Sequence, residues 1–398
     1  MSINSLMIAL IICANLIALI LDTLGIASSG VVPLVFGLSL IISIINSIIL
    51  KTKLRVSIKS ILLLIYILVV FTFSLLARGF DGATYKYMIM FLAYGGIIFL
   101  VTLMEFDSYK VIKYTMMLGI LFLINPLKIA GYSPISTTLS GQISMGASYA
   151  FLPCVAAAII HLFFYRDRVS LFIKVAYLAN ASLLFLLLKE ATRGVLLSII
   201  ILCLYIYFTR IGIKQSRTRT LKIFGILLLM FSGSLLLIAN LESVLINIYE
   251  LMKRMGFEVS SIIKTNDLIQ SEGGIVGILN GRGLIYMNAL EMIKTSPIWG
   301  LGIGAYEDIY GTYQHNIFLQ LFTEGGILLV LPISIIIIQC FSKLVKEVLK
   351  IEKTPKMQLL LMLFVISIPR LMISSYLWQE QTFWLLIFIF LKGRDLND

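Results

Sequence analysis

Long apolar runs recur along the whole of this 398-residue chain and constrain its fold more than any other feature. Runs of ~20 apolar residues are long enough to cross a bilayer as helices. A mean hydropathy of +1.01, with only 13% charged residues, excludes an ordinary soluble domain. The sequence predicts an all-α integral membrane protein with about twelve spans, at roughly 5–21, 31–50, 58–77, 87–104, 111–125, 146–165, 169–188, 195–209, 222–239, 317–341, 357–375 and 381–391.

The basic residues are distributed in a way that predicts the orientation of these spans. Lysine and arginine cluster in every second loop, at 51–59, 110–113, 166–168, 210–222 and 343–356. Such clusters normally face the cytoplasm, so twelve spans place both termini there. We therefore expect the net charge of +12 to meet membrane lipids and solvent, and we expect no nucleic-acid partner.

One long interruption separates the ninth predicted span from the tenth. It divides the chain into an N-terminal transmembrane bundle (1–239), an external loop (240–316) and C-terminal transmembrane helices (317–398). Within the loop, Leu284, Met287, Leu290 and Ile293 recur at helical spacing. The pattern predicts an amphipathic helix that lies along the membrane surface.

Three arginines lie on the predicted external side, where positive charge is otherwise sparse: Arg193 in KEATRGVLLS, Arg282 in NGRGLIY and Arg370 in ISIPRLMISS. A single arginine at such a place is often a snorkelling side chain or half of an ion pair. Together, three planar guanidinium groups favour a phosphorylated ligand at the outer leaflet. Lys189 and Glu190 either support Arg193 or pair with each other, and their spacing leaves both options open.

His315 follows the polar end of the external loop and is one of only two histidines. Its ordinary pKa near 6.5 suits a general base, although an interfacial histidine can also be a plain hydrogen-bonding group. Glu324 could hold the imidazole or could be a structural cap. His161, beside the basic YRDR stretch, is expected to be structural.

Metal ligands are not expected in this chain. The two histidines are predicted to lie on opposite faces of the membrane. The four cysteines, at positions 13, 154, 203 and 340, fall in separate apolar runs without paired spacing. We interpret them as small core residues, with no disulfide and no metal site.

These residues resemble a known family. Arg282, the following ALEMIKTSPIWGLGIGAY and HNIFLQLFTEGGILLVLP stretches, and the short ATRGVLLSI motif look like the signature of bacterial O-antigen polymerases and ligases, the Wzy and WaaL proteins. The His–Asn pair followed by Glu-Gly-Gly is the most specific element. Thr192 stands where many members carry serine.

The resemblance implies a GT-C-like, metal-independent glycosyltransferase without a cofactor, in the bacterial inner membrane and with its site facing the periplasm. Its donor would be an oligosaccharide on undecaprenyl diphosphate, and a chain-length regulator protein would be a partner. Arg193, Arg282 and Arg370 would bind the diphosphate. His315 and Glu324 would be catalytic, with Lys189, Glu190 and Asn316 in support.

Several activities remain open at this point. A polymerase, which lengthens the glycan on its lipid carrier, is favoured over a ligase, which transfers it to a lipid A core. A lipid-linked oligosaccharide flippase is the alternative from another class, but transporters show related halves and polar groups near the bilayer midplane. A peptidoglycan-type polymerase is a further alternative, although its motifs are not evident.

Overall fold

The computed structural model describes residues 2–26, 30–52, 54–80, 82–126, 140–165, 170–190, 192–211, 282–348 and 354–393. Every regular element in these ranges is helical, which confirms the predicted all-α class. The α-helices are α1 (Ser2–Ile12), α2 (Ala14–Thr23), α3 (Val31–Ile49), α4 (Ile58–Arg78), α5 (Ala83–Phe91), α6 (Ile97–Thr102), α7 (Ser108–Leu118), α9 (Ser140–Phe164), α10 (Leu171–Glu190), α11 (Arg193–Ile211), α16 (Gly283–Thr295), α17 (Ala305–Tyr310), α18 (Ile317–Val348), α19 (Pro355–Ile373) and α20 (Gln381–Leu391).

Six helical segments in the described ranges are long and apolar enough to cross a membrane, or seven if the bent α1–α2 pair counts as one span. Shorter apolar helices at Leu171–Leu187, Gly194–Thr209 and Gln381–Leu391 occupy three further predicted runs. The chain is thus a multi-pass membrane protein, and the count of twelve stays a prediction. The predicted span at 222–239 and the loop residues 240–281 lie outside the described residues.

Local sequence signals set several helix ends. The Asp107 side chain accepts a hydrogen bond from the Lys110 amide (3.2 Å) at the start of α7. The Thr354 hydroxyl does the same for the Met357 amide (3.4 Å) at the start of α19, where Pro355 occupies the first helical position. Both are side-chain N-caps, which satisfy amides that a helix start leaves without partners.

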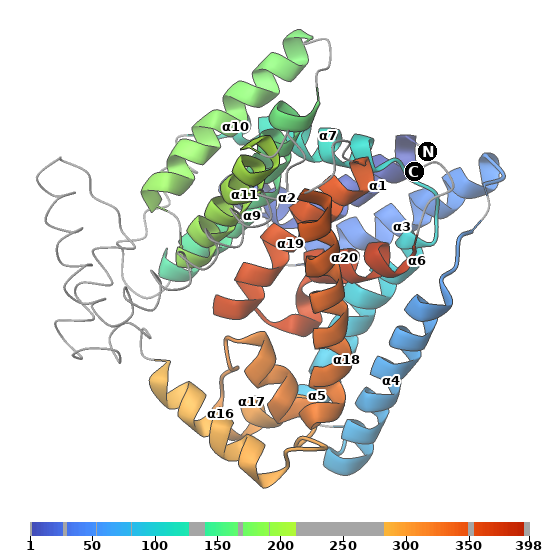
Figure 1. Cartoon of the computed structure of the whole chain (residues 1–398), viewed down its shortest axis with the longest axis vertical. Helices are drawn as coiled ribbons and strands as arrows, with labels where there is room; N and C mark the ends of the chain where they lie inside the picture. Colours follow the sequence, from blue (N-terminus) through green and yellow to red (C-terminus); the bar gives the residue numbers. More distant parts are fainter. Residues whose placement is uncertain are drawn as a thin grey trace, which may run out of the picture.

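The helices are arranged with α16 and α17 at one end of the bundle and both chain termini at the other (Figure 1). Helices α3 and α4 expose large apolar side chains, among them Ile48 (70% exposed) and Leu76 (71%). Such surfaces suit contact with lipid tails. Cys203 on α11 is also exposed, so the expectation that all four cysteines are core residues is wrong for this one; all four are free thiols.

The short helix α20 is deeply buried. Its residues from Gln381 to Ile389 are all buried, and it packs against α6 and α19. Eleven residues rise only ~16 Å, about half of the hydrocarbon core. The preceding segment, Ser374–Glu380, is mostly non-helical, and residues 375–378 and Glu380 are buried. Non-helical backbone in an apolar surrounding is tolerated only where protein groups satisfy it.

Candidate functional site

The break between α19 and α20 is held by three side chains from the segment that precedes α18. Asn316 Nδ2 donates to the Met372 carbonyl (3.4 Å), Arg282 Nη1 to the Ile373 carbonyl, and the Tyr313 hydroxyl to the Ser374 carbonyl (3.0 Å). The last carbonyls of a helix lack partners within it and carry partial negative charge. Hydrogen-bond donors from side chains of the predicted external loop therefore bond the carbonyls at the end of α19.

Arg370, in the last turn of α19, is paired with a buried carboxylate. Its Nη1 lies 3.1 Å from Glu380 Oε2, and the Glu380 side chain is only 1% exposed. Two hydroxyls complete the shell of Glu380: Ser375 Oγ donates to Oε2 (2.9 Å) and Thr382 Oγ1 to Oε1 (2.7 Å). These partners compensate for the removal of the carboxylate from water. The carboxylate fixes the position of the guanidinium group.

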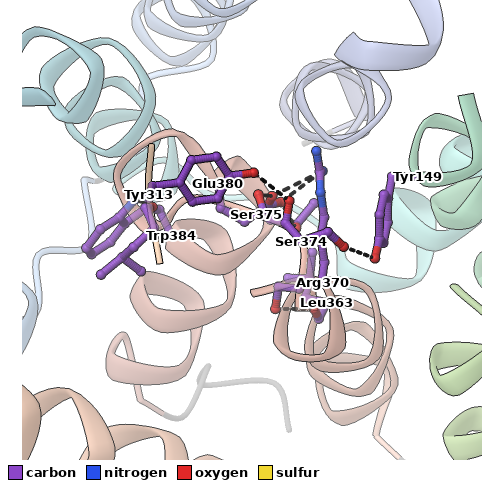
Figure 2. A network of polar contacts seen from close by, with 11 residues as sticks. Tyr149, Tyr313, Leu363, Arg370, Ser374, Ser375, Glu380 and Trp384 are labelled. Atoms are coloured by element: carbon purple, nitrogen blue, oxygen red, sulfur yellow. Dashed lines mark hydrogen bonds and ion pairs between the residues drawn. The ribbon is translucent and has the colours of Figure 1, made fainter. Parts of the chain in front are cut away.

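Tyr149 of α9 covers the other face of Arg370 (Figure 2). The guanidinium carbon lies 4.8 Å from the centroid of the Tyr149 ring, within cation–π range. The Tyr149 hydroxyl shares a 2.6 Å hydrogen bond with Ser374 Oγ. Arg370 is therefore clamped between an aromatic face and an anion, and 21% of its side chain stays exposed.

Arg193 and Gly194 lie at the start of α11. Gly194 abuts the Tyr149 hydroxyl so closely that a Cβ built there would collide with it. The backbone of the predicted arginine motif therefore lies beside the residue that stacks on Arg370. The side chains of Arg193, Lys189 and Glu190 lie outside the described part of the structure, and their roles stay predictions.

Arg282 and Arg370 come together around Tyr313. Burial raises the pKa of Tyr313, and the positive charges of Arg282 and Arg370 each offset part of that rise. Two of the three predicted arginines therefore act on one tyrosine, although 88 positions separate them in the sequence (370 − 282). Such a pair of cations beside a helix break is a suitable site for an anionic group.

His315 lies next to this cation pair. Its ring centroid is 4.0 Å from that of Tyr313, and its φ of 53° is uncommon for a residue other than glycine. Its Nδ1 is buried without a hydrogen-bond partner among the described residues. Burial, and secondarily the charge of Arg282, lowers the pKa of His315 to about 4. The imidazole is therefore neutral near pH 7, and its Nδ1 keeps its hydrogen-bonding capacity unused among the described residues.

The hydrogen-bond partners of Glu324 are residues other than His315. Its fully buried carboxylate accepts hydrogen bonds from Trp378 Nε1 (2.8 Å), Tyr376 (3.3 Å), Gln320 (3.3 Å) and the Gly304 amide (3.4 Å). His315 is not among these partners. The geometry supports the structural option for Glu324, because it ties the α16–α17 loop to the segment after α19.

The two glycines after Glu324 let the α16–α17 loop approach α18. Gly326 interrupts the helix with φ 58° and ψ −155°, a region essentially restricted to glycine. Beside it, the Ile327 amide donates to the Pro297 carbonyl (2.9 Å), and the Leu301 amide to the Thr323 carbonyl (2.8 Å). The Glu-Gly-Gly motif is therefore a docking point for the loop that precedes His315.

We expect Gly326→Ala to destabilise the protein strongly. The new Cβ would overlap the Ile298 carbonyl, and the backbone strain alone costs ~1–3 kcal/mol. The check is the folded yield and melting temperature of the full chain in detergent. Gly25→Ala is the matched control, since Gly25 also has positive φ (80°) but nothing within 4 Å of its Cβ position. Equal melting temperatures for the two variants would contradict the docking role.

Several site residues were not predicted from the sequence. Tyr149, Glu380 and Tyr313 carry no motif, because tyrosines and isolated acids occur throughout apolar chains. A usable signal did exist for Glu380, since a single carboxylate in the apolar stretch SSYLWQEQTFW requires a partner. The predicted structural role of His161 agrees with its surroundings, where Nδ1 bonds the Tyr177 hydroxyl at 2.7 Å.

Helix α16 forms where the spacing predicted an amphipathic helix. Its apolar stripe points away from the protein. Leu284 (68% exposed), Met287 (65%) and Leu290 (50%) face outward, whereas Ala289 and Met292 are buried. Arg282 immediately precedes this helix. The apolar stripe suits a helix at a membrane surface, so the cation pair lies next to an element that can contact lipid.

Comparison with protein families gives one match. Residues 178–333 match the family model Wzy_C, described as O-Antigen ligase. This confirms the resemblance to the Wzy and WaaL superfamily and supports a part in O-antigen glycan assembly, without separating polymerase from ligase. The matched range holds Arg193, Arg282, His315 and Glu324, whereas Arg370 lies beyond it. No curated protein and no solved structure matches the chain.

Proposed function

We propose that this chain, whose central part matches the O-antigen ligase family model, is a polysaccharide polymerase. It transfers a growing glycan from undecaprenyl diphosphate to the next lipid-linked repeat unit. The observation that carries the proposal is the convergence of Arg282, Arg370 and a neutral His315 at the end of α19.

The two guanidinium groups bind the diphosphate of the donor. Among the described residues, Arg282 uses one of its five N–H donors on the Ile373 carbonyl, which leaves others for phosphate oxygens. Arg370 is held in place by Glu380 before any ligand arrives. Donors fixed in advance stabilise the charge that develops as the sugar–phosphate bond breaks, and each such group is typically worth ~10²–10³ in rate.

His315 serves the acceptor. The bond between the donor sugar's anomeric carbon and the diphosphate oxygen breaks, and that carbon forms a bond to the acceptor hydroxyl oxygen. The hydroxyl proton passes to the imidazole, whose Nδ1 has no partner in the described part of the chain, and then to solvent. Because Arg282 contributes to the low pKa of the histidine, a bound diphosphate that offsets this charge makes the imidazole a stronger base.

A ligase is the second candidate, since the description of the matching family model favours it. In a ligase the same cation pair would bind the donor diphosphate, and His315 would act on an acceptor hydroxyl of a lipid A core. The two activities differ only in which acceptor reaches His315.

The test supplies the purified full-length protein in nanodiscs with the host's undecaprenyl-diphosphate-linked repeat unit, with and without lipid A core. A ladder of products that grows by one repeat without lipid A core is the expected result. A single product that forms only with lipid A core would identify a ligase instead. Absence of any new glycosidic bond under both conditions would contradict glycosyl transfer altogether.

A further inference from the structure

A cavity of ≈ 250 Å³ is lined in part by Tyr313. Its wall includes Tyr87 and Met90 of α5, Tyr313, Tyr376 and Gln379. Pockets that enclose drug-sized ligands are usually ~300–1,000 Å³, so this one fits a small ring rather than a lipid or a long oligosaccharide.

Closely packed tyrosines form part of the cavity wall and hold it in a fixed position. The Tyr87 and Tyr376 ring centroids are 4.1 Å apart at 31°, and Tyr313 stands edge-on to Tyr376 at 5.4 Å and 83°. The Tyr376 hydroxyl is anchored on the buried Glu324 carboxylate at 3.3 Å. Both Tyr87 and Tyr376 are only 3% exposed, so their rings are preorganised before a ligand enters.

Polar groups line the cavity beside these tyrosines, and Lys86 Nζ lies over the Tyr87 ring at 5.2 Å from its centroid. Lys86 Nζ and Glu307 Oε1 form an ion pair at 2.8 Å, and the exposed Gln379 adds an amide. Together they present donors and acceptors in the same wall as the aromatic rings. A ring with apolar C–H faces and a rim of hydroxyls matches this distribution, whereas an apolar ligand would leave the polar rim unpaired.

The cavity and the cation pair are joined through one residue. Tyr313 lines the cavity, touches His315 at 4.0 Å between ring centroids, and bonds the Ser374 carbonyl beside Arg370. A ring held in the cavity therefore contacts Tyr313, whose own ring lies against that of His315.

We propose that this cavity binds a pyranose ring of the acceptor glycan and presents its hydroxyl to His315. The inference rests on the proposed function, and it assigns the acceptor subsite that the arginines leave undefined. Specificity for the acceptor sugar then comes from Lys86, Glu307 and Gln379, because hydroxyl patterns are distinguished by paired polar groups.

The test measures two ligands separately on the full-length protein in nanodiscs. Methyl glycosides of glucose, galactose, mannose, rhamnose and N-acetylglucosamine probe the cavity by saturation-transfer NMR. Undecaprenyl diphosphate probes the cation pair by native mass spectrometry.

Thr312→Trp places a bulky ring at the cavity wall, and Gln379→Ala removes a polar group from its rim. Tyr310→Trp is the matched control, since Tyr310 is in the same segment but outside the cavity wall.

We expect at least one glycoside to bind the wild-type protein. Thr312→Trp and Gln379→Ala should each weaken that binding ~tenfold or more, which corresponds to a loss of about 1.4 kcal/mol in binding free energy. Tyr310→Trp should bind normally, and all three variants should keep undecaprenyl diphosphate. No glycoside binding to the wild type, or unchanged binding in both cavity variants, would overturn the inference. If the wild-type protein binds a glycoside but does not bind undecaprenyl diphosphate, the proposed donor site is contradicted and the sugar subsite is retained.

Discussion

Arg370→Ala is expected to lose both stability and glycan transfer, and a second substitution should restore only the stability. Removal of the guanidinium leaves Glu380, 1% exposed, without its countercharge. Breaking a buried pair in this way costs ~3–5 kcal/mol, and the partial exposure of Arg370 places the expected value toward the lower end. In Arg370→Ala/Glu380→Gln the buried charge is removed as well, so the melting temperature should return toward that of the wild type.

Transfer activity separates the two roles of Arg370. The double variant should fold yet remain ~10²–10³-fold less active, because the cation that stabilises the leaving diphosphate is still missing. Arg370→Lys should be intermediate, since lysine keeps the charge but loses the planar fork and its stacking on Tyr149. The measurements are melting temperature and product ladder for each variant. Full activity in the stable double variant would reduce Arg370 to a purely structural residue.

His315→Ala should lower transfer by ~10²–10⁴-fold while undecaprenyl diphosphate still binds. His315→Gln keeps a hydrogen-bonding group without a titratable nitrogen, so it separates positioning of the acceptor from proton transfer. His315→Gly tests the backbone alone, because glycine adopts the φ of 53° without strain. His161→Gln is the control for a histidine outside the site. Wild-type activity in both the Ala and the Gln variant would remove His315 from the mechanism.

The pH dependence of the wild type follows from the same residue. Only the neutral imidazole accepts a proton, so activity is lost as the pH falls through the pKa and is retained above it. With a pKa of about 4 in the free protein, kcat/KM should stay level down to about pH 5 and fall below that. The bound diphosphate raises the pKa, so the acidic limb of kcat should lie at higher pH than that of kcat/KM. Coincident limbs would mean that donor charge does not reach His315.

The chain's fold class and the positions of most helices could be predicted because they depend on local patterns. An apolar run of ~20 residues has few alternatives to a membrane helix, since an unsatisfied backbone is too costly in lipid. The amphipathic helix from Gly283 to Thr295 was likewise found from its spacing. The burial of α20 could not be predicted, because a run that is apolar on all sides does not reveal whether its neighbours are lipids or helices.

By itself, the sequence determined that this is a helical membrane protein whose central part resembles the Wzy and WaaL superfamily, with arginines and a histidine collected in a few short motifs. Only the tertiary structure decided which of them meet. It placed Arg370 on Glu380 and Tyr149, and it drew Arg282 to the end of α19. It also gave Glu324 four hydrogen-bond donors, and within the described part of the chain it left His315 Nδ1 without a partner. The reason is physical: a buried charge is stabilised by whichever partners the fold brings within ~3 Å, and sequence distance does not encode those partners.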